Sequence, residues 1–222
     1  MPYKTTKNVI DRMDAKRKHI LDTALRIFTE KGYNNTTMKD LIEGAGISVG
    51  SFYSYFQNKE KLFDQLREEI IHMLYGVLCN EFEQKALPIA ERFGRGIMVY
   101  LNTIEANRDL ARIMMIEAVG LNPAYERKRA ETTRMFINYS AQQFNTLQEL
   151  KGLSPAEVET VAIAFIGTIY NVTMEWLQSD GKKPLTDSAF QLIIYNLRAL
   201  RLSFNENDVR RYVEETIKLG GN

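Results

Sequence analysis

Two short amphipathic segments joined by a tight turn constrain the fold of this chain more than any other part of its sequence. The first segment spans residues 38–44, and the second is opened by Ser48, a residue type that commonly caps the start of a helix. Ala45-Gly46-Ile47 lies between them, and this spacing is expected where two helices cross steeply. The sequence therefore predicts a helix-turn-helix over residues 38–56.

The start of the second helix has the features of a DNA-reading element. Val49, Gly50 and Ser51 occupy its first turn, where a helix that enters the major groove contacts base edges. Their side chains are small, so the backbone can come close to the bases. We therefore assign these three residues to base contacts.

Aromatic residues dominate the remainder of this helix. Phe52 and Phe56 are four residues apart on one helical face and are expected to face the core. Tyr53 and Tyr55 point in other directions and can send their hydroxyl groups to DNA phosphates, and Lys59, at the start of the next helix, supplies a cation. The alternative is that the tyrosines, like the two Phe residues, only pack the core of a small helical domain.

These residues together resemble the N-terminal signature of the TetR (tetracycline-repressor) family of bacterial transcription regulators. The resemblance covers roughly residues 15–65 and rests on Thr36-Thr37-Met38-Lys39-Asp40-Leu41, Ala45-Gly46-Ile47-Ser48, Gly50-Ser51-Phe52-Tyr53, Tyr55-Phe56 and Asn58-Lys59-Glu60-Lys61-Leu62. Two positions depart from the family pattern, since Val49 stands where many relatives carry Lys or Arg and Ile42 where they often carry Ala. The expected DNA-binding residues are Thr37, Lys39, Ser48, Val49, Gly50, Ser51, Tyr53, Tyr55 and Lys59.

The distribution of charge agrees with a DNA-binding N-terminal region. The formal net charge is only +1, but residues 1–63 carry 11 Lys and Arg against 7 Asp and Glu, whereas residues 64–222 carry 18 against 21. A basic excess on one part of a chain is typical of nucleic-acid binding. The first residues carry several basic side chains, which form either an arm that follows the DNA backbone or a solvated leader. These basic residues are Lys4, Lys7, Arg12, Lys16, Arg17 and Lys18.

The remaining sequence shows helical periodicity and little strand signal, so the fold class is expected to be all-α. We expect a three-helix DNA-binding domain over residues 1–60 and a larger helical domain for ligand binding and dimerisation over residues 61–222. Asn122-Pro123 and Ser154-Pro155-Ala156-Glu157 are typical helix starts. Helices are expected over residues 13–31, 58–84, 88–105, 108–119, 122–150, 154–178 and 186–202, with a short one after residue 205.

The expected helix over residues 154–178 is apolar almost all the way round. A helix that faces one core needs only an apolar stripe, so this helix is expected to face two surfaces. The family resemblance implies a four-helix dimer interface, and the alternative is burial inside a monomer. The interface candidates are Ala162, Ile166, Gly167, Phe190, Ile193 and Leu197. A dimer would place two reading helices about 34–36 Å apart on a near-palindromic operator.

Thioether and aromatic side chains are concentrated in the larger domain, where they suit either an adaptable apolar cavity or an ordinary core. The carboxylate of Glu117 or Glu175 could orient a cationic or hydroxyl-bearing ligand if it faced inward. The ligand is expected to be a small apolar or amphipathic molecule. The candidate ligand-binding residues are Met98, Met114, Glu117, Met135, Tyr139, Phe165, Tyr170, Met174 and Trp176.

An enzyme is the competing class, and the sequence offers it little support. His19 and His72 have no Cys or His partners at metal-ligand spacing, so neither a metal nor a cofactor is expected. Gly46-Ile47-Ser48-Val49-Gly50 matches a hydrolase elbow by letters, but a helix precedes it where the elbow needs a strand. An all-helical adaptor that uses its helix-turn-helix for protein contacts is a third class.

The cellular setting expected from the sequence is the cytoplasm. A single Cys79 cannot form an internal disulfide, no apolar run is expected to span a bilayer, and the first residues lack a signal peptide. The sequence thus predicts a homodimeric, ligand-responsive transcriptional repressor, with double-stranded DNA and a small molecule as partners and no membrane.

Overall fold

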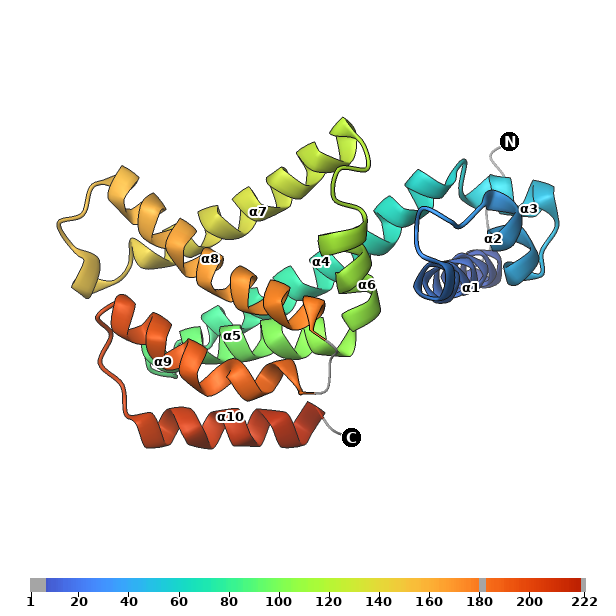
Figure 1. The fold of residues 1–222 in the computed structure, drawn as a ribbon. Coiled ribbons are helices and arrows are strands. Elements are labelled where there is room, and N and C mark those ends of the chain that lie inside the picture. The colour runs from blue at the N-terminus through green and yellow to red at the C-terminus, as the bar shows by residue number, and fades with distance from the viewer. Residues whose placement is uncertain (1–6, 180–182, 221–222) are drawn as a thin grey trace. The chain divides into compact units, whose positions relative to one another are not determined.

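The computed structural model describes residues 7–179 and 183–220, and all regular elements in these two ranges are helical, which confirms the expected all-α class (Figure 1). The α-helices are α1 (Lys7–Lys31), α2 (Met38–Ala45), α3 (Val49–Tyr55), α4 (Lys59–Glu83), α5 (Ile89–Ala106), α6 (Arg108–Arg112), α7 (Pro123–Phe144), α8 (Pro155–Gln178), α9 (Ala189–Ala199) and α10 (Glu206–Gly220). Of the basic residues expected in an N-terminal arm, Lys4 lies outside the described residues, as do the side chains of Lys7 and Arg12.

The chain divides into two compact units. The first contains Met1–Ile70 together with Arg112–Ala118, and the second contains Ile71–Ala111 and Val119–Asn222. The division therefore falls inside α4, later than the boundary at residue 60 that the sequence suggested. A short segment from the middle of the chain, Arg112–Ala118, also joins the N-terminal unit.

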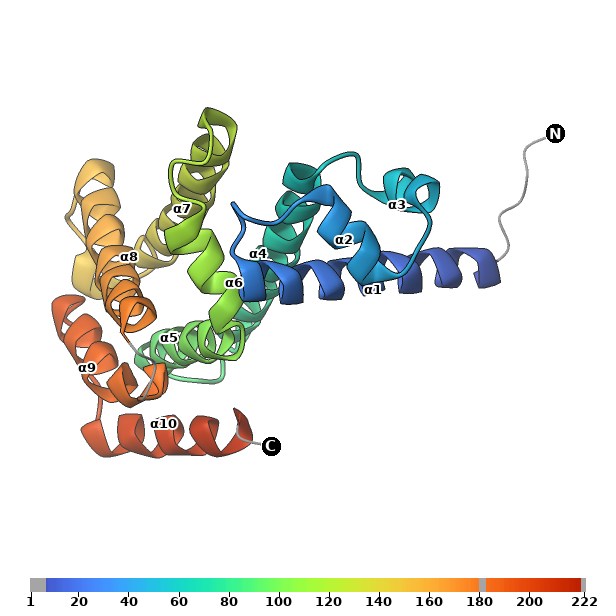
Figure 2. The ribbon, with the colours of Figure 1, turned by 45° about the vertical axis from the view of Figure 1, so that its right-hand side comes forward.

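In the N-terminal unit, α1 and α2 pack closely against each other (Figure 2). Gly44 permits this approach, because a Cβ atom there would lie 2.5 Å from Cδ1 of Ile27 in α1. Three aromatic residues, Phe28, Tyr33 and Phe63, form the centre of the core, with ring centroids 4.7 to 6.0 Å apart. The core therefore joins α1, the turn that follows it and α4.

In the second unit, α5 packs against α8, α9 and α10. Its aromatic core contains Phe82, Phe93, Phe144 and Phe165, with neighbouring rings 4.8 to 6.0 Å apart. Gly94 in α5 lets the buried ring of Tyr212 from α10 lie directly on the helix backbone. A Cβ atom at Gly94 would lie only 1.8 Å from the Tyr212 hydroxyl oxygen.

The helix starts expected from capping residues are confirmed. Asn122 accepts a hydrogen bond from the Tyr125 N–H with Pro123 in first position, and Ser154 forms a reciprocal capping box with Glu157. The helix ends agree less well. The expected helix over residues 108–119 ends as an α-helix at Arg112 and continues as a π-helical turn, Ile113–Glu117, closed by the Ala118 N–H donating to the Ile113 carbonyl.

Two other expected helices are shorter than the sequence suggested. Helix α7 ends at Phe144, where the Leu147 backbone turns extended, and Gln148–Leu150 form a separate 3₁₀ turn. The helix expected over residues 186–202 begins as a 3₁₀ turn, Leu185–Ser188, and its α-helical part ends at Ala199. Apolar periodicity continues across these breaks, which is why it could not locate them.

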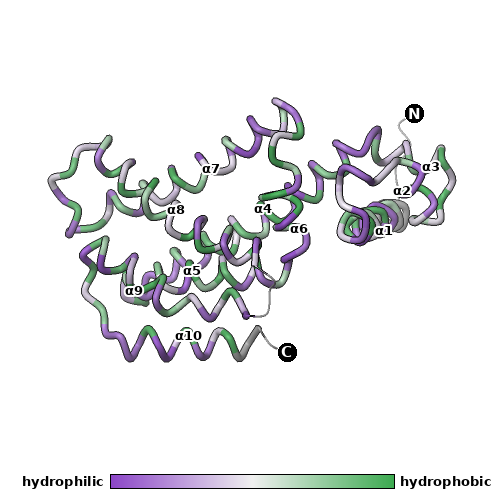
Figure 3. Tube along the Cα trace, in the orientation of Figure 1, coloured by the Kyte–Doolittle hydropathy of each residue, from purple (hydrophilic) through white to green (hydrophobic). Residues whose placement is uncertain are grey.

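Among the described helices, α8 is long and apolar enough to cross a membrane by length and composition alone, which the sequence reading had not recognised. Hydrophobic residues occupy much of its trace (Figure 3). One face of α8 carries the buried Phe165 and Ile169, whereas Ile163 and Ala164 are exposed. The second, exposed face is the reason that this helix is apolar on more than one side.

Candidate nucleic-acid interface

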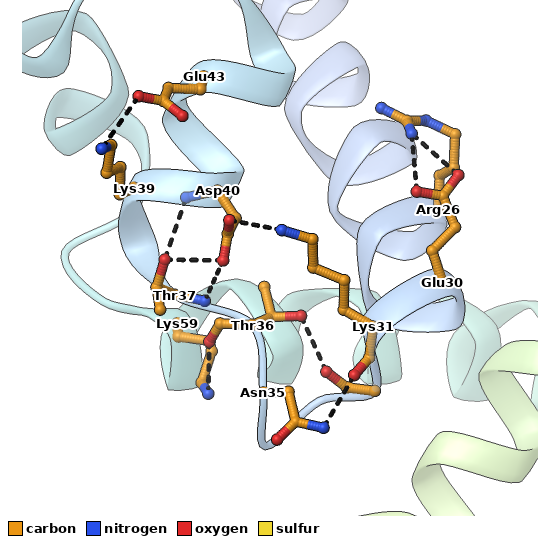
Figure 4. Close-up of polar contacts among 11 residues, drawn as sticks. Arg26, Glu30, Lys31, Asn35, Thr36, Thr37, Lys39, Asp40, Glu43 and Lys59 are labelled. Atoms are coloured by element: carbon orange, nitrogen blue, oxygen red, sulfur yellow. Dashed lines mark hydrogen bonds and ion pairs between the residues drawn. The ribbon is translucent and has the colours of Figure 1, made fainter.

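Thr37 and Asp40 fix the start of α2 through a reciprocal capping box (Figure 4). The Asp40 N–H donates to Oγ1 of Thr37, and the Asp40 carboxylate accepts from the Thr37 N–H at 2.8 Å and from Nζ of Lys31 at 2.6 Å. The Lys31 ammonium and the Thr37 backbone hold the pKa of Asp40 well below its usual range. The carboxylate therefore stays charged and keeps α2 tied to the end of α1 at neutral pH.

The turn between α2 and α3 has the geometry that the sequence predicted. Gly46 ends α2 in the left-handed conformation, with φ +62°, which a glycine adopts without steric cost. Ser48 then caps α3, since its hydroxyl oxygen accepts a hydrogen bond from the Ser51 N–H. On the other side, Nε2 of His19 lies 3.0 Å from the Ala45 carbonyl oxygen, which pairs the last turn of α2 with α1.

The side chains of α3 separate into buried and exposed sets. Phe52 and Phe56 are buried, as expected, and anchor the helix in the core. Val49 and Tyr53 are exposed, with 58% and 46% of their surface accessible, and Tyr55 is half-buried. The outward face of α3 thus carries an apolar side chain at its first turn and a phenol one turn later.

Other expected DNA-binding residues are also accessible to a partner. Thr37, Lys39, Ser48 and Gly50 are exposed, and Ser51 is half-buried. Lys39 lies 3.7 Å from Glu43 one turn away, a pairing too exposed to hold the ammonium in place. The Lys39 cation can therefore exchange its carboxylate partner for a phosphate.

Lys59 lies differently from what the sequence suggested. Its ammonium donates hydrogen bonds to the backbone carbonyls of Tyr33, at 2.8 Å, and Thr36, at 2.9 Å, and sits 4.4 Å from the centre of the Tyr33 ring. The side chain is half-buried. Lys59 therefore clamps the turn after α1 onto the start of α4, and the free phosphate-binding cation expected at this position is not what the structure shows.

Lys61 is an exposed cation that was not among the DNA-binding residues expected from the sequence. It lies in the first turn of α4, where its N–H is capped by the Asn58 side chain, and its own side chain is exposed. The sequence Asn58-Lys59-Glu60-Lys61 alone does not show which of its two lysines faces solvent. The two lysines differ because Lys59 reaches the carbonyl groups of the buried turn at Tyr33, whereas Lys61 points to solvent.

The candidate ligand-binding residues do not share one site. Met98 and Phe165 are buried in the core of the second unit, whereas Met114 and Glu117 belong to the N-terminal unit. Glu117 forms an ion pair with Arg112 at 3.5 Å, so its carboxylate is already satisfied by a cation. Tyr170, Met174, Trp176 and the exposed Glu175 lie along α8.

Trp176 is held by its own surroundings. Its indole N–H donates to the Lys183 carbonyl at 2.8 Å, and the Arg108 guanidinium lies 5.1 Å from the ring centre. The ring is half-buried. These contacts assign Trp176 to the packing of α8 against α6.

Met135 and Tyr139, by contrast, line an open cavity of about 680 Å³ between α4 and α7. Burial raises the pKa of Tyr139 above its ordinary value, and a hydrogen bond with the Cys79 thiol adds to the shift, so the phenol is neutral. The cavity combines two tyrosine rings with amide and charged groups. Its lining residues are Tyr75, Ala130, Glu131, Arg134, Met135, Asn138, Tyr139 and Gln142.

The candidate dimer residues need correction. Ala162, Ile193 and Leu197 are fully buried inside the protomer, so they have no surface to offer to a second copy. Ile166, Gly167 and Phe190 remain half-buried. An open groove instead lies between α8 and α9, and it is lined by Ile163, Ala164, Gly167, Thr168, Asn171, Val172, Asp187, Ser188, Gln191, Leu192 and Tyr195.

Sequence comparison places the N-terminal unit among known regulators. Residues 20–66 match the family described as bacterial regulatory proteins, tetR family. The transcriptional repressor DhaR of Mycobacterium sp. (strain GP1) is 25% identical over 54% of this chain and 59% of its own length. The repressor KstR2 of Mycobacterium tuberculosis is 30% identical over 50% of this chain and 54% of its own length. The chain thus spans little more than half the length of these two relatives.

Structural comparison extends the likeness to most of the chain. FadR from Bacillus subtilis, solved in complex with stearoyl-CoA, superposes with a TM-score of 0.72 at 20% identity, over 82% of this chain and 98% of FadR. FadR from Bacillus halodurans gives a TM-score of 0.71, also at 20% identity, over 81% of this chain and 97% of that protein. Both units therefore have the fold of these regulators. Residues 20–66 therefore match the tetR family of bacterial regulatory proteins in sequence, and the described chain shares the fold of these regulators.

Proposed function

We propose that this protein is a cytoplasmic transcriptional repressor that binds a near-palindromic operator as a homodimer and is released by a small amphipathic ligand. The observation that carries the proposal is the first turn of α3. Val49 and Gly50 are exposed there while Phe52 and Phe56 anchor the helix from behind. A rigidly held helix with an open first turn is what major-groove reading requires.

Selection of DNA from a random duplex library tests this function. The full-length protein should enrich one motif whose two halves are inverted copies, centred about 10 base pairs apart. An adaptor that uses its helix-turn-helix for protein contacts would enrich no motif. The match of residues 20–66 to a family of regulatory proteins weighs against that class and against an enzyme. Failure to enrich any motif at low salt would contradict the proposal.

The groove between α8 and α9 supports a homodimer. Ile163 and Tyr195, 45% and 60% exposed, are exposed large apolar residues that border it. Asn171 and Gln191 add polar groups to the same surface, which suits a protein partner better than the hydrocarbon of a membrane. A second copy that packs its own α8 and α9 here would bury the second face of α8.

We expect the double variant Ile163→Asp/Tyr195→Asp to be monomeric, because burying two carboxylates in the interface is unfavourable. Light scattering should show a halved mass at micromolar concentration. Leu153→Asp is the matched control, since Leu153 is also an exposed apolar residue but lies outside the groove, and it should leave the mass unchanged. A double variant with the mass of the wild type would place the interface elsewhere.

The cavity between α4 and α7 supports an amphipathic effector. Tyr75, Met135 and Tyr139 provide apolar surface, while Asn138 and Gln142 provide amide groups. The presence of stearoyl-CoA in the related FadR structure supports a ligand of this class. Helix α4 starts in the N-terminal unit and ends in the second unit. A ligand against Tyr75 therefore contacts a helix that is shared by both units.

Filling the cavity tests its role. Asn138→Trp should abolish binding of stearoyl-CoA, because the indole would fill the cavity between α4 and α7. The variant should fold normally, because Asn138 is exposed. Isothermal titration measures the affinity. Thr133→Trp, also exposed on α7 but away from the cavity, should bind as the wild type does. Equal binding by both variants would exclude this cavity as the ligand site.

A further inference from the structure

The reading helix lacks the side chains that usually identify purines. Arg and Lys read guanine, and Asn and Gln read adenine, through paired hydrogen bonds in the major groove. Helix α3 has the sequence Val-Gly-Ser-Phe-Tyr-Ser-Tyr and contains none of these four residue types. Base discrimination by α3 must therefore come from hydroxyl groups or from apolar contact.

The hydroxyl groups near the first turn are engaged with the backbone. Ser48 Oγ accepts from the Ser51 N–H at 3.3 Å, and Ser54 Oγ donates to the Ser51 carbonyl at 2.6 Å. Ser51 itself is half-buried. The residue of the first turn with the most accessible large side chain is Val49, at 58%.

The position of Val49 suits close contact with a base. A Cβ atom at the neighbouring Gly50 would meet nothing within 4 Å, so no side chain keeps the groove floor away from this turn. Exposed single apolar residues are common on protein surfaces and need no explanation by themselves. Val49, however, lies in the helical turn that approaches base edges. Its neighbour Gly50 has no side chain that would keep the DNA away from this turn.

We propose that Val49 is a specificity-determining residue that recognises the C5-methyl group of a thymine in each operator half-site. Thymine is the one base that presents an apolar group in the major groove, where it is matched by apolar side chains. The inference rests on the proposed function, because it requires α3 to enter the major groove. It adds the identity of one base and the chemical group by which that base is read.

Replacement of single thymines by uracil in the selected duplex tests the inference, since only the C5-methyl group is lost. At one thymine per half-site, uracil should weaken binding of the wild type about fourfold, the factor expected for burial of one methyl group. The same uracil should have almost no effect on Val49→Ala, which is exposed and should fold normally. At this position 5-methylcytosine should bind the wild type about fourfold better than cytosine, which restores the methyl group alone.

The possible outcomes distinguish a failure of the Val49 assignment from a failure of the proposed repressor function. A selected duplex whose uracil forms all bind as tightly as the thymine form would overturn the role of Val49 and leave the repressor function intact. A uracil penalty of equal size in the wild type and in Val49→Ala would assign the methyl contact to another residue, which also overturns it. A protein that selects no duplex at all would overturn both.

Discussion

Replacement of Lys59 by alanine is expected to destabilise the N-terminal unit by about 2–3 kcal/mol, because two buried carbonyl groups lose a charged donor. The ammonium holds the carbonyls of Tyr33 and Thr36 and lies against the Tyr33 ring. Hydrogen exchange of the amides in residues 20–66 measures this loss locally. The protection of these amides should fall while that of α8 is retained.

Lys61→Ala is the matched control for this prediction. Lys61 lies two residues further along α4 and is exposed, so its removal should change stability by no more than about 0.5 kcal/mol. In the opposite pattern, the amides of Lys59→Ala would keep their protection from hydrogen exchange, but the variant would bind every DNA sequence more weakly. The salt dependence of its DNA affinity would also be reduced by about one unit. That pattern would return Lys59 to the phosphate-binding role suggested by the sequence.

Gly94→Ala should destabilise the second unit by about 1–3 kcal/mol, the usual cost of forcing extra volume into a packed core. The new methyl group would overlap the Tyr212 hydroxyl, and Tyr212 is 2% exposed, so its ring has no free space to enter. Urea unfolding followed by Trp176 fluorescence reports on this unit. The midpoint should shift to lower urea with an unchanged slope.

Two variants check the cause of this effect. Gly76→Ala changes another helical glycine, but a Cβ atom there meets nothing within 4 Å, so the variant should be as stable as the wild type or more stable. Tyr212→Phe should cost little, because the buried hydroxyl has no hydrogen-bond partner among the described residues. A Gly94→Ala midpoint equal to that of Gly76→Ala would contradict the contact between α5 and α10.

Local sequence signals predicted the helix-turn-helix well because each has a short-range cause. Gly46 ends α2 through its left-handed backbone, Ser48 caps α3, and the spacing of Phe52 and Phe56 places both on the buried face. The capping residues Asn122 and Ser154 located α7 and α8 for the same reason. These features depend on residues within one turn of each other, so the sequence contains them directly.

Features that depend on distant contacts could not be predicted in the same way. Lys59 turns inward because it meets carbonyl groups 23 and 26 residues earlier in the chain. Ile193 is buried although its helix carries the exposed Tyr195 two residues later, and apolar character alone cannot tell which face meets a core and which meets a partner. The π-helical turn at Ile113–Glu117 likewise has no signature in apolar periodicity.

DNA recognition by the first turn of α3 underlies both the repressor function and the thymine contact of Val49. Gly50 and Gly76 are both exposed helical glycines with open space around them, so leucine at either position should leave the fold intact. The decisive measurement is the ratio of affinities for the selected duplex and a scrambled duplex at fixed salt. We predict a ratio of at least about a thousand for the wild type and Gly76→Leu, and loss of most of it in Gly50→Leu. An undiminished ratio in Gly50→Leu would contradict the account.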